Sequence, residues 1–225
     1  MFSEIENKEL SVSPVAMKAD GVLADDLPPP LDTFKSGHNL IICGASGMGK
    51  STLMLNLISK QHKKVKGQKI RQSFRKCFHN IFIVSPSLNT LNNNVFSDLD
   101  ENKKATEFDE DWLNYFYEEL DKIKHEGEEA GENHYTLLIL DDAAVSLRKN
   151  RRLEQKFVQL LQNRRHLGSG GVSVWCLVQS YLNISPQHRN NLTHFITMKP
   201  KTPKERVADL STTEPRPAKR SAILS

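Results

Sequence analysis

Residues 39–52 read NLIICGASGMGKST, a short apolar run that leads into a glycine-rich segment and then into Lys50 and Ser51. Residues 44–51 match the phosphate-binding (Walker A) pattern G-x-x-x-x-G-K-[S/T] in full. The apolar run predicts a buried strand, and the residues after the loop predict a helix with one apolar side. A strand, a glycine-rich loop and a helix in this order are the context in which the pattern binds nucleotide phosphates.

Each residue type in this loop suits a polyphosphate. Glycines permit backbone conformations that a Cβ would obstruct, so that N–H groups turn inward toward an anion, and the helix amino terminus adds partial positive charge. Lys50 is long enough to reach the β and γ phosphates, and the Ser51 hydroxyl is a hard oxygen ligand for Mg²⁺. We therefore predict that ATP and Mg²⁺ are the cofactors, and that the nucleotide-binding residues are Gly44, Ala45, Ser46, Gly47, Met48, Gly49, Lys50, Ser51 and Thr52.

A second apolar run, residues 136–140, ends in two adjacent carboxylates, Asp141 and Asp142. Neighbouring acids at the tip of a buried strand repel each other in the absence of a cation. We predict that Asp141 joins Ser51 in the metal site and that Asp142 orients or deprotonates the attacking water. The alternative is helix capping, because the chain turns into another segment here and Asp is a good N-cap residue.

A third apolar run ends in Gln179, and two arginines are further candidates for catalysis. The carboxyl end of a strand in an α/β sheet is where ligands bind, so Gln179 is placed to hydrogen-bond the γ phosphate or the lytic water. A glutamine merely exposed at a strand end is the alternative. Arg165 and Arg189 are each a candidate for the arginine that stabilises the γ phosphate in a neighbouring subunit. The alternative for each is an ordinary surface residue.

The apolar runs alternate with helical patterns along the chain. Runs without polar alternation predict strands buried on both faces, at residues 39–43, 80–85, 136–140, 173–178 and 194–198. Apolar residues at helical spacing predict helices around Trp112, Phe116, Leu120 and Ile123 and around Leu153, Phe157, Leu160 and Leu161. Strands separated by helices imply parallel pairing, so the predicted fold class is α/β, with a mainly parallel central sheet in three layers.

The ends of the chain differ in composition from its centre. Residues 1–36, which include three consecutive prolines, predict a flexible leader, and residues 200–225, rich in Pro, Thr and charge, predict a disordered tail. The folded P-loop domain is expected over residues 37–199. Residues 60–76 are basic without any acidic residue, which is interpreted as a solvated surface or as a contact for a phosphate backbone.

Bulk properties exclude some classes of protein. No apolar run approaches the about 18 residues of a membrane span, and the amino terminus has no signal-peptide pattern. Three cysteines without CxxC spacing predict reduced thiols and an intracellular setting. The net charge of +4 is too small to indicate a nucleic-acid partner by itself.

Four segments resemble a known family. GASGMGKST (44–52), LLILDD (137–142), NRRHLGSGGVSVWCLVQSY (163–181) and HRNNLTHFI (188–196) are similar to motifs of the genome-packaging ATPases of large DNA viruses and virophages. These belong to the poxvirus-type branch of the FtsK/HerA division of P-loop motors. The resemblance covers residues 38–198, and its most specific part is the Arg-His pair before the apolar strand that ends in Val-Gln-Ser-Tyr.

The resemblance implies a fold and a function. It implies an additional-strand (ASCE) core, in which the strand bearing Gln179 lies between the strands bearing the P-loop and Asp141. It also implies a homo-oligomeric ring that pumps double-stranded DNA into a capsid, with capsid or packaging proteins as partners and the virion or the host assembly site as its location. By position, Asp142 takes the place of the catalytic carboxylate, Gln179 is the sensor and Arg165 is the preferred trans-acting finger. Many relatives have Glu where this chain has Asp142.

A DNA motor needs contacts to the phosphate backbone rather than to the bases. Four basic residues just after the metal-binding strand are placed to face a central pore: Arg148, Lys149, Arg151 and Arg152. Two other functions stay open, a small-molecule kinase that uses the same loop and a non-hydrolysing nucleotide-binding module of a larger assembly. For a kinase, no arginine-rich lid is visible in the acidic connection at residues 96–133.

Overall fold

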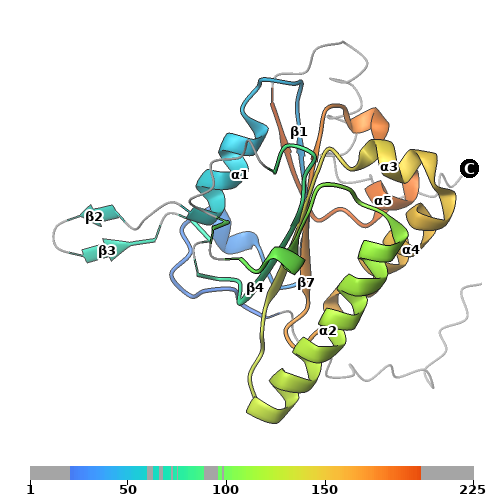
Figure 1. Ribbon diagram of the computed structural model, residues 1–225. Coiled ribbons are helices and arrows are strands. Elements are labelled where there is room, and N and C mark those ends of the chain that lie inside the picture. Colours follow the sequence, from blue (N-terminus) through green and yellow to red (C-terminus); the bar gives the residue numbers. More distant parts are fainter. Residues whose placement is uncertain are drawn as a thin grey trace, which may run out of the picture.

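The computed structural model describes residues 21–59, 63–65, 68–71, 73–74, 76–88, 96–97 and 99–198. Its centre is a six-stranded sheet in the order β5–β4–β6–β7–β1–β8, in which all neighbouring strands run parallel. Helices cover both faces of this sheet, with α1 on the left and α2 to α5 on the right in Figure 1. The predicted α/β class with a parallel sheet in three layers is confirmed.

All five predicted strands form, and each end lies within one residue of its predicted place. A sixth strand, β5, was not predicted, because a two-residue strand carries no periodic signal. The strands are β1 Asn39–Cys43, β4 Asn80–Val84, β5 Lys104–Ala105, β6 Thr136–Asp141, β7 Val172–Val178 and β8 His194–Thr197.

Side chains of the central strands alternate between two hydrophobic cores, as the pleat requires. Ile41 and Leu138 lie in one core, which α2 (Glu110–Ala130) and α4 (Arg151–Asn163) cover. Leu40 and Leu137 lie in the other core, which α1 (Lys50–Ser59) covers with Met54. Every residue of β1, β6 and β7 is buried, which explains why these runs lack polar alternation.

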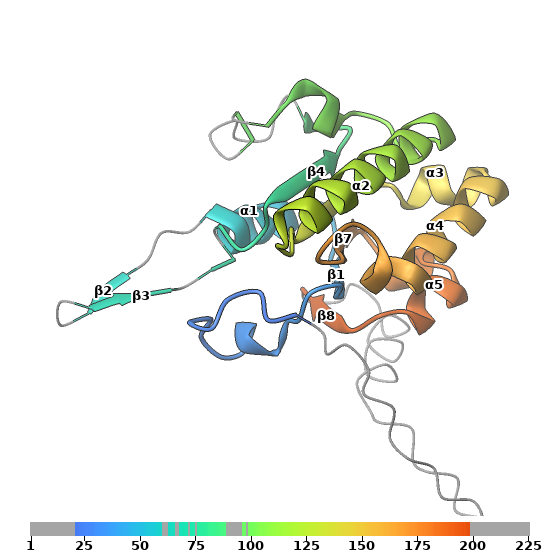
Figure 2. The ribbon, with the colours of Figure 1, turned by 90° about the horizontal axis from the view of Figure 1, so that it is seen from below.

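The amino-terminal part of the described chain packs on the α1 side. Leu23, Leu27 and Phe34 are buried in the same core as α1, and the Phe34 ring stacks on His194 of β8 at 3.7 Å between centroids. Figure 2 shows this segment, in blue, lying next to β1 and β8. Residues 21–36 therefore differ from the flexible leader expected over 1–36. Residues 1–20 and the predicted tail at 200–225 lie outside the described residues.

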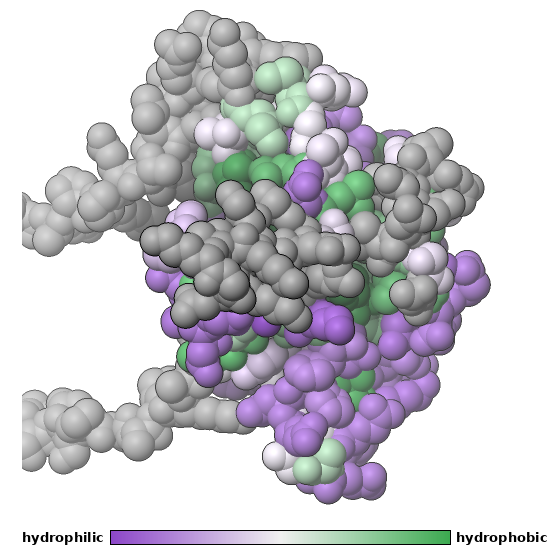
Figure 3. All heavy atoms as spheres, turned by 90° about the vertical axis from the view of Figure 1, so that its left-hand side faces the viewer, coloured by the Kyte–Doolittle hydropathy of each residue, from purple (hydrophilic) through white to green (hydrophobic). Residues whose placement is uncertain are grey.

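The basic stretch at residues 60–76 contains a feature that the sequence did not predict. β2 (Lys63–Val65) and β3 (Gln68–Ile70) pair antiparallel as a separate two-stranded ribbon that projects from the α1 side of the molecule (Figure 1). Lysines interrupt the apolar alternation on which strand prediction depends. Figure 3 shows the face that bears α1, where hydrophilic residues lie beside smaller hydrophobic areas.

Two short helices complete the face covered by α2 and α4. α3 (Ala144–Lys149) follows β6, and α5 (Pro186–Asn190) lies between β7 and β8. Among the helices that the structure describes, none combines the length and the apolar character that a bilayer crossing requires.

Candidate nucleotide-binding site

The three predicted motifs meet at one edge of the sheet. The P-loop follows β1, Gln179 follows β7, and Asp141 and Asp142 lie at the end of β6. Parallel pairing in the order β6–β7–β1, with Cys43 beside Val178, brings these strand ends together. The strand that leads to Gln179 therefore lies between the other two, and the expected ASCE arrangement is confirmed.

The P-loop has the backbone that its glycines predict. Gly47 and Gly49 adopt φ values of +77° and +87°, in the left-handed region that favours glycine. Gly44 is needed for a different reason, because a Cβ at this position would lie 2.6 Å from the Met198 side chain. Lys50 begins α1, and its Nζ donates to the Ala45 carbonyl at 3.2 Å, so its side chain bends back over the loop.

Asp141 is almost buried, with 8% of its surface exposed, and its Oδ2 accepts a hydrogen bond from Ser85 Oγ at 2.9 Å. Burial raises the pKa of the Asp141 carboxyl, while the hydrogen bond from Ser85 opposes this rise. The neighbouring Asp142 also raises this pKa, and the Lys50 ammonium lowers it. Lys50 is thus close enough to Asp141 for its charge to act on the carboxylate.

The residues present fit a magnesium ion held together with a nucleotide. A serine hydroxyl and a carboxylate oxygen, from Ser51 and Asp141, are hard oxygen donors of the kind Mg²⁺ prefers. Within the described part of the chain, no group of three or more His, Cys, Asp or Glu side chains is arranged to hold a metal. Phosphate oxygens and water usually complete the shell of this ion, and they would do so here.

Asp142 and Gln179 touch each other directly. Gln179 Nε2 donates to Asp142 Oδ2 at 3.1 Å, across the ends of β7 and β6. Asp142 has φ of +57°, a left-handed conformation that Asp tolerates better than most residues, and its N–H donates to the Leu177 carbonyl at 3.1 Å. The N-cap of α3 is Ala143 without a side-chain hydrogen bond, so neither aspartate caps this helix.

The sequence matches the profile of the family described as Poxvirus A32 protein over residues 32–213. The chain belongs to this family. Its motif, its fold and its family are those of a P-loop ATPase, and the resemblance to the poxvirus-type packaging ATPases is confirmed. No curated protein matches the sequence at a significant level.

Several solved structures are similar to this A32 family member. The cytoplasmic domain of EssC has a TM-score of 0.49 at 16% sequence identity, and the match covers 77% of this chain and 35% of the EssC chain. EssC (ATPases 2 and 3) from Geobacillus thermodenitrificans has a TM-score of 0.47 at 17% sequence identity, and the match covers 88% of this chain and 42% of the EssC chain. B204, described as the DNA-packaging ATPase from Sulfolobus turreted icosahedral virus, has a TM-score of 0.48 at 14% sequence identity, and the match covers 79% of this chain and 83% of the B204 chain. The chain therefore spans less than half the length of the EssC structures.

The two arginines lie in different surroundings. Arg165 packs against Gly37, which precedes β1, so it lies at the sheet edge opposite the P-loop of its own chain. A five-residue strand separates these edges by about 17 Å, which excludes a contact with the nucleotide in the same chain. Arg189, on α5, is partly buried, and its guanidinium stacks over the Tyr181 ring at 5.1 Å.

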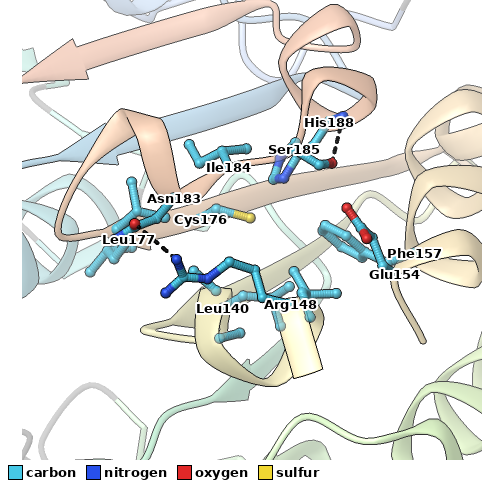
Figure 4. A pocket seen from close by; sticks show the side chains of 14 residues that line it. Leu140, Arg148, Glu154, Phe157, Cys176, Leu177, Asn183, Ile184, Ser185 and His188 are labelled. Atoms are coloured by element: carbon cyan, nitrogen blue, oxygen red, sulfur yellow. Dashed lines mark hydrogen bonds between the residues drawn. The ribbon is translucent and has the colours of Figure 1, made fainter. Parts of the chain in front are cut away.

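The four basic residues predicted to contact DNA are all exposed, on α3 and on the first turn of α4. Arg148 donates to Asn183 Oδ1 at 3.2 Å, and Arg152 pairs with Glu110 at 3.2 Å. Figure 4 shows Arg148 reaching across a small apolar pocket to Asn183, which follows β7. The cluster thus lies just beyond the carboxyl ends of the strands that bear Asp142 and Gln179.

Ser85 is the residue at this edge that sequence reasoning missed. It follows β4 directly, it is completely buried, and its hydroxyl contacts Asp141. The signal was present in the sequence, because Ser85 ends an apolar run just as Gln179 does. Only the position of β4 next to β6 reveals its partner.

Proposed function

We propose that this A32 family member is an ATP-hydrolysing motor that translocates double-stranded DNA and packages a viral genome into a capsid. The observation that carries the proposal is the meeting of the P-loop, Asp142 and Gln179 at three adjacent strand ends, with Gln179 bonded to Asp142. A phosphate-binding loop beside an acid and an amide has the parts that hydrolysis of a γ phosphate needs.

The roles of the residues follow from their chemistry. The N–H groups of residues 44–52 and the Lys50 ammonium would bind the phosphates. Ser51 and Asp141 would hold Mg²⁺, which would supply positive charge to the phosphate oxygens. Asp142 accepts the proton of the attacking water or orients it, and Gln179 hydrogen-bonds the same water or the γ phosphate. Their mutual hydrogen bond keeps both groups close to one reacting position.

The remaining parts of the motor are proposed from their location. Arg165 lies on the edge away from its own P-loop, which supports a role toward the nucleotide of a neighbouring copy in a ring. Arg189 is the second candidate for this role. Arg148, Lys149, Arg151 and Arg152 form an exposed basic cluster that suits the DNA phosphate backbone. Packaging proteins or the capsid would be further partners, and the virion assembly site would be the location.

The experiment that tests the proposal measures ATP hydrolysis with and without double-stranded DNA, for the wild type and for Lys50→Ala. We expect DNA to raise the turnover of the wild type and Lys50→Ala to lose at least about 99% of it, because the charge that stabilises the transferred phosphoryl group is gone. Lys122→Ala removes an exposed lysine of α2, which is not part of the loop, and serves as the control. Transfer of phosphate to nucleosides without any response to DNA would support a kinase instead, and tight binding of ATP without turnover would support a non-hydrolysing module.

A further inference from the structure

The end of β4 carries a polar residue that the proposed mechanism does not use. The sheet pairs Val84 with Leu140, so the next residues along the two strands, Ser85 and Asp141, lie side by side. Ser85 is 0% exposed, and its backbone N–H donates to the Ala105 carbonyl of β5 at 2.9 Å. The serine is therefore held from both sides at a fixed place beside the Asp141 carboxylate.

The direction of the hydroxyl proton follows from the neighbours of Ser85. The backbone N–H of Ser87 donates to Ser85 Oγ at 3.2 Å, so this oxygen acts as an acceptor toward Ser87. A serine hydroxyl has one proton to donate, and the Oδ2 atom of Asp141 lies 2.9 Å away. Ser85 thus donates to Oδ2, which keeps the carboxylate plane in one orientation and leaves Oδ1 for other partners.

We propose that Ser85 is a positioning residue that presents Oδ1 of Asp141 to the bound cation. This inference rests on the proposed function, because it assumes that Asp141 contributes to the magnesium site. Partners of metal-ligating carboxylates fix the orientation of the ligand, and removing one typically costs 10- to 100-fold in metal affinity or activity. In this role Ser85 would act on the metal only through Asp141.

A serine that only fills space at the end of β4 would not affect metal binding, whereas a positioning serine would. The test therefore measures metal binding separately from nucleotide binding. The binding of Mn²⁺, as a spectroscopic substitute for Mg²⁺, is measured by electron paramagnetic resonance in the presence of ATP. The binding of ATP without metal, in EDTA, is measured by calorimetry on the same samples. We expect Ser85→Ala to weaken Mn²⁺ binding about 10- to 100-fold and to change metal-free ATP binding less than about twofold.

Three further variants make the test decisive. Ser85→Thr keeps a hydroxyl and is expected to bind Mn²⁺ within about threefold of the wild type, whereas Ser85→Cys keeps the volume with a weak donor and is expected to lose affinity as Ala does. Ser173→Ala is the matched control, because Ser173 is also a buried serine, on β7, and contacts His38 rather than Asp141. It is expected to bind Mn²⁺ as the wild type does.

The results separate this inference from the proposed function. Folded Ser85→Ala or Ser85→Cys protein that binds Mn²⁺ with wild-type affinity would overturn the positioning role while leaving the nucleotide site intact. Wild-type protein that binds neither ATP nor Mn²⁺ with ATP would overturn the proposed function itself.

Discussion

Asp142 and Gln179 share one hydrogen bond at the carboxyl edge of the sheet, and this bond allows a prediction at the scale of single residues. Asp142→Asn keeps the shape of the side chain but removes the carboxylate that we propose as the base. We expect the rate of ATP hydrolysis to fall by about 10²- to 10⁴-fold, while ATP binding changes little because Asp142 lies outside the P-loop. Steady-state kinetics and equilibrium binding of ATP check the two parts. A variant with unchanged turnover would exclude Asp142 as the catalytic base.

His188 gives a second prediction at this scale, for stability against pH. It is 4% exposed, and burial lowers its pKa from 6.5 to about 4. Between these values the unfolded chain binds a proton that the folded chain excludes, so the free energy of unfolding falls as the pH falls. At pH 5 this loss amounts to about 2 kcal/mol, and it is expected to disappear in His188→Leu.

Urea unfolding at pH 7.5 and pH 5.0 gives the drop in the free energy of unfolding between the two pH values for each protein. The effect of His188 is the difference between the drop in the wild type and the drop in His188→Leu. The drop should be smaller by about 2 kcal/mol in His188→Leu than in the wild type. His125→Gln removes an exposed imidazole of α2 and serves as the control, for which we expect the wild-type drop. Equal drops in all three proteins would contradict the assignment of acid sensitivity to His188.

At the scale of elements, the start of α4 depends on one side chain. The Asn150 carboxamide oxygen accepts hydrogen bonds from the N–H groups of Arg152 and Leu153, and its Nδ2 donates to Glu110 at the start of α2. Asn150→Ala removes the cap and this link, so we expect a loss of about 1 kcal/mol in the free energy of unfolding, measured by urea denaturation. Asn163→Ala, at the other end of α4 where no side-chain cap bond forms, should cost less than half as much. An equal cost at both ends would contradict the role of the cap.

At the scale of the whole molecule, charge is distributed unevenly, and the exposed basic cluster on α3 and α4 lies beyond the carboxyl edge of the sheet. Replacing Arg148, Lys149, Arg151 and Arg152 together by Gln should reduce the rise in ATP turnover caused by DNA at least about tenfold. The slope of log affinity for DNA against log salt concentration is negative, and it should become shallower by about 0.9 for each phosphate that the variant no longer neutralises. Lys122→Gln with Lys124→Gln, on the exposed side of α2, is the control and should leave both quantities unchanged. Unchanged DNA stimulation in the fourfold variant would contradict the proposed contact between these four residues and DNA.

The sequence by itself determined the P-loop, the ends of the long strands and the α/β class. These features depend on interactions among residues close in the chain: glycines that permit a curled loop before Lys50, and continuous apolar runs such as residues 136–140 that only a doubly covered sheet can bury. The family resemblance added the order of the strands, which the structure bears out.

Only the tertiary structure decided which distant residues meet. Ser85 lies beside Asp141 because β4 pairs with β6, and Arg165 lies away from its own P-loop because it precedes β7 at the amino edge of the sheet. Residues 21–36 join the core through Leu23, Leu27 and Phe34, although their local sequence reads as a leader. Local patterns reach over a few residues, whereas strand order and the burial of a distant segment are set by packing across the whole chain, which no short window of sequence contains.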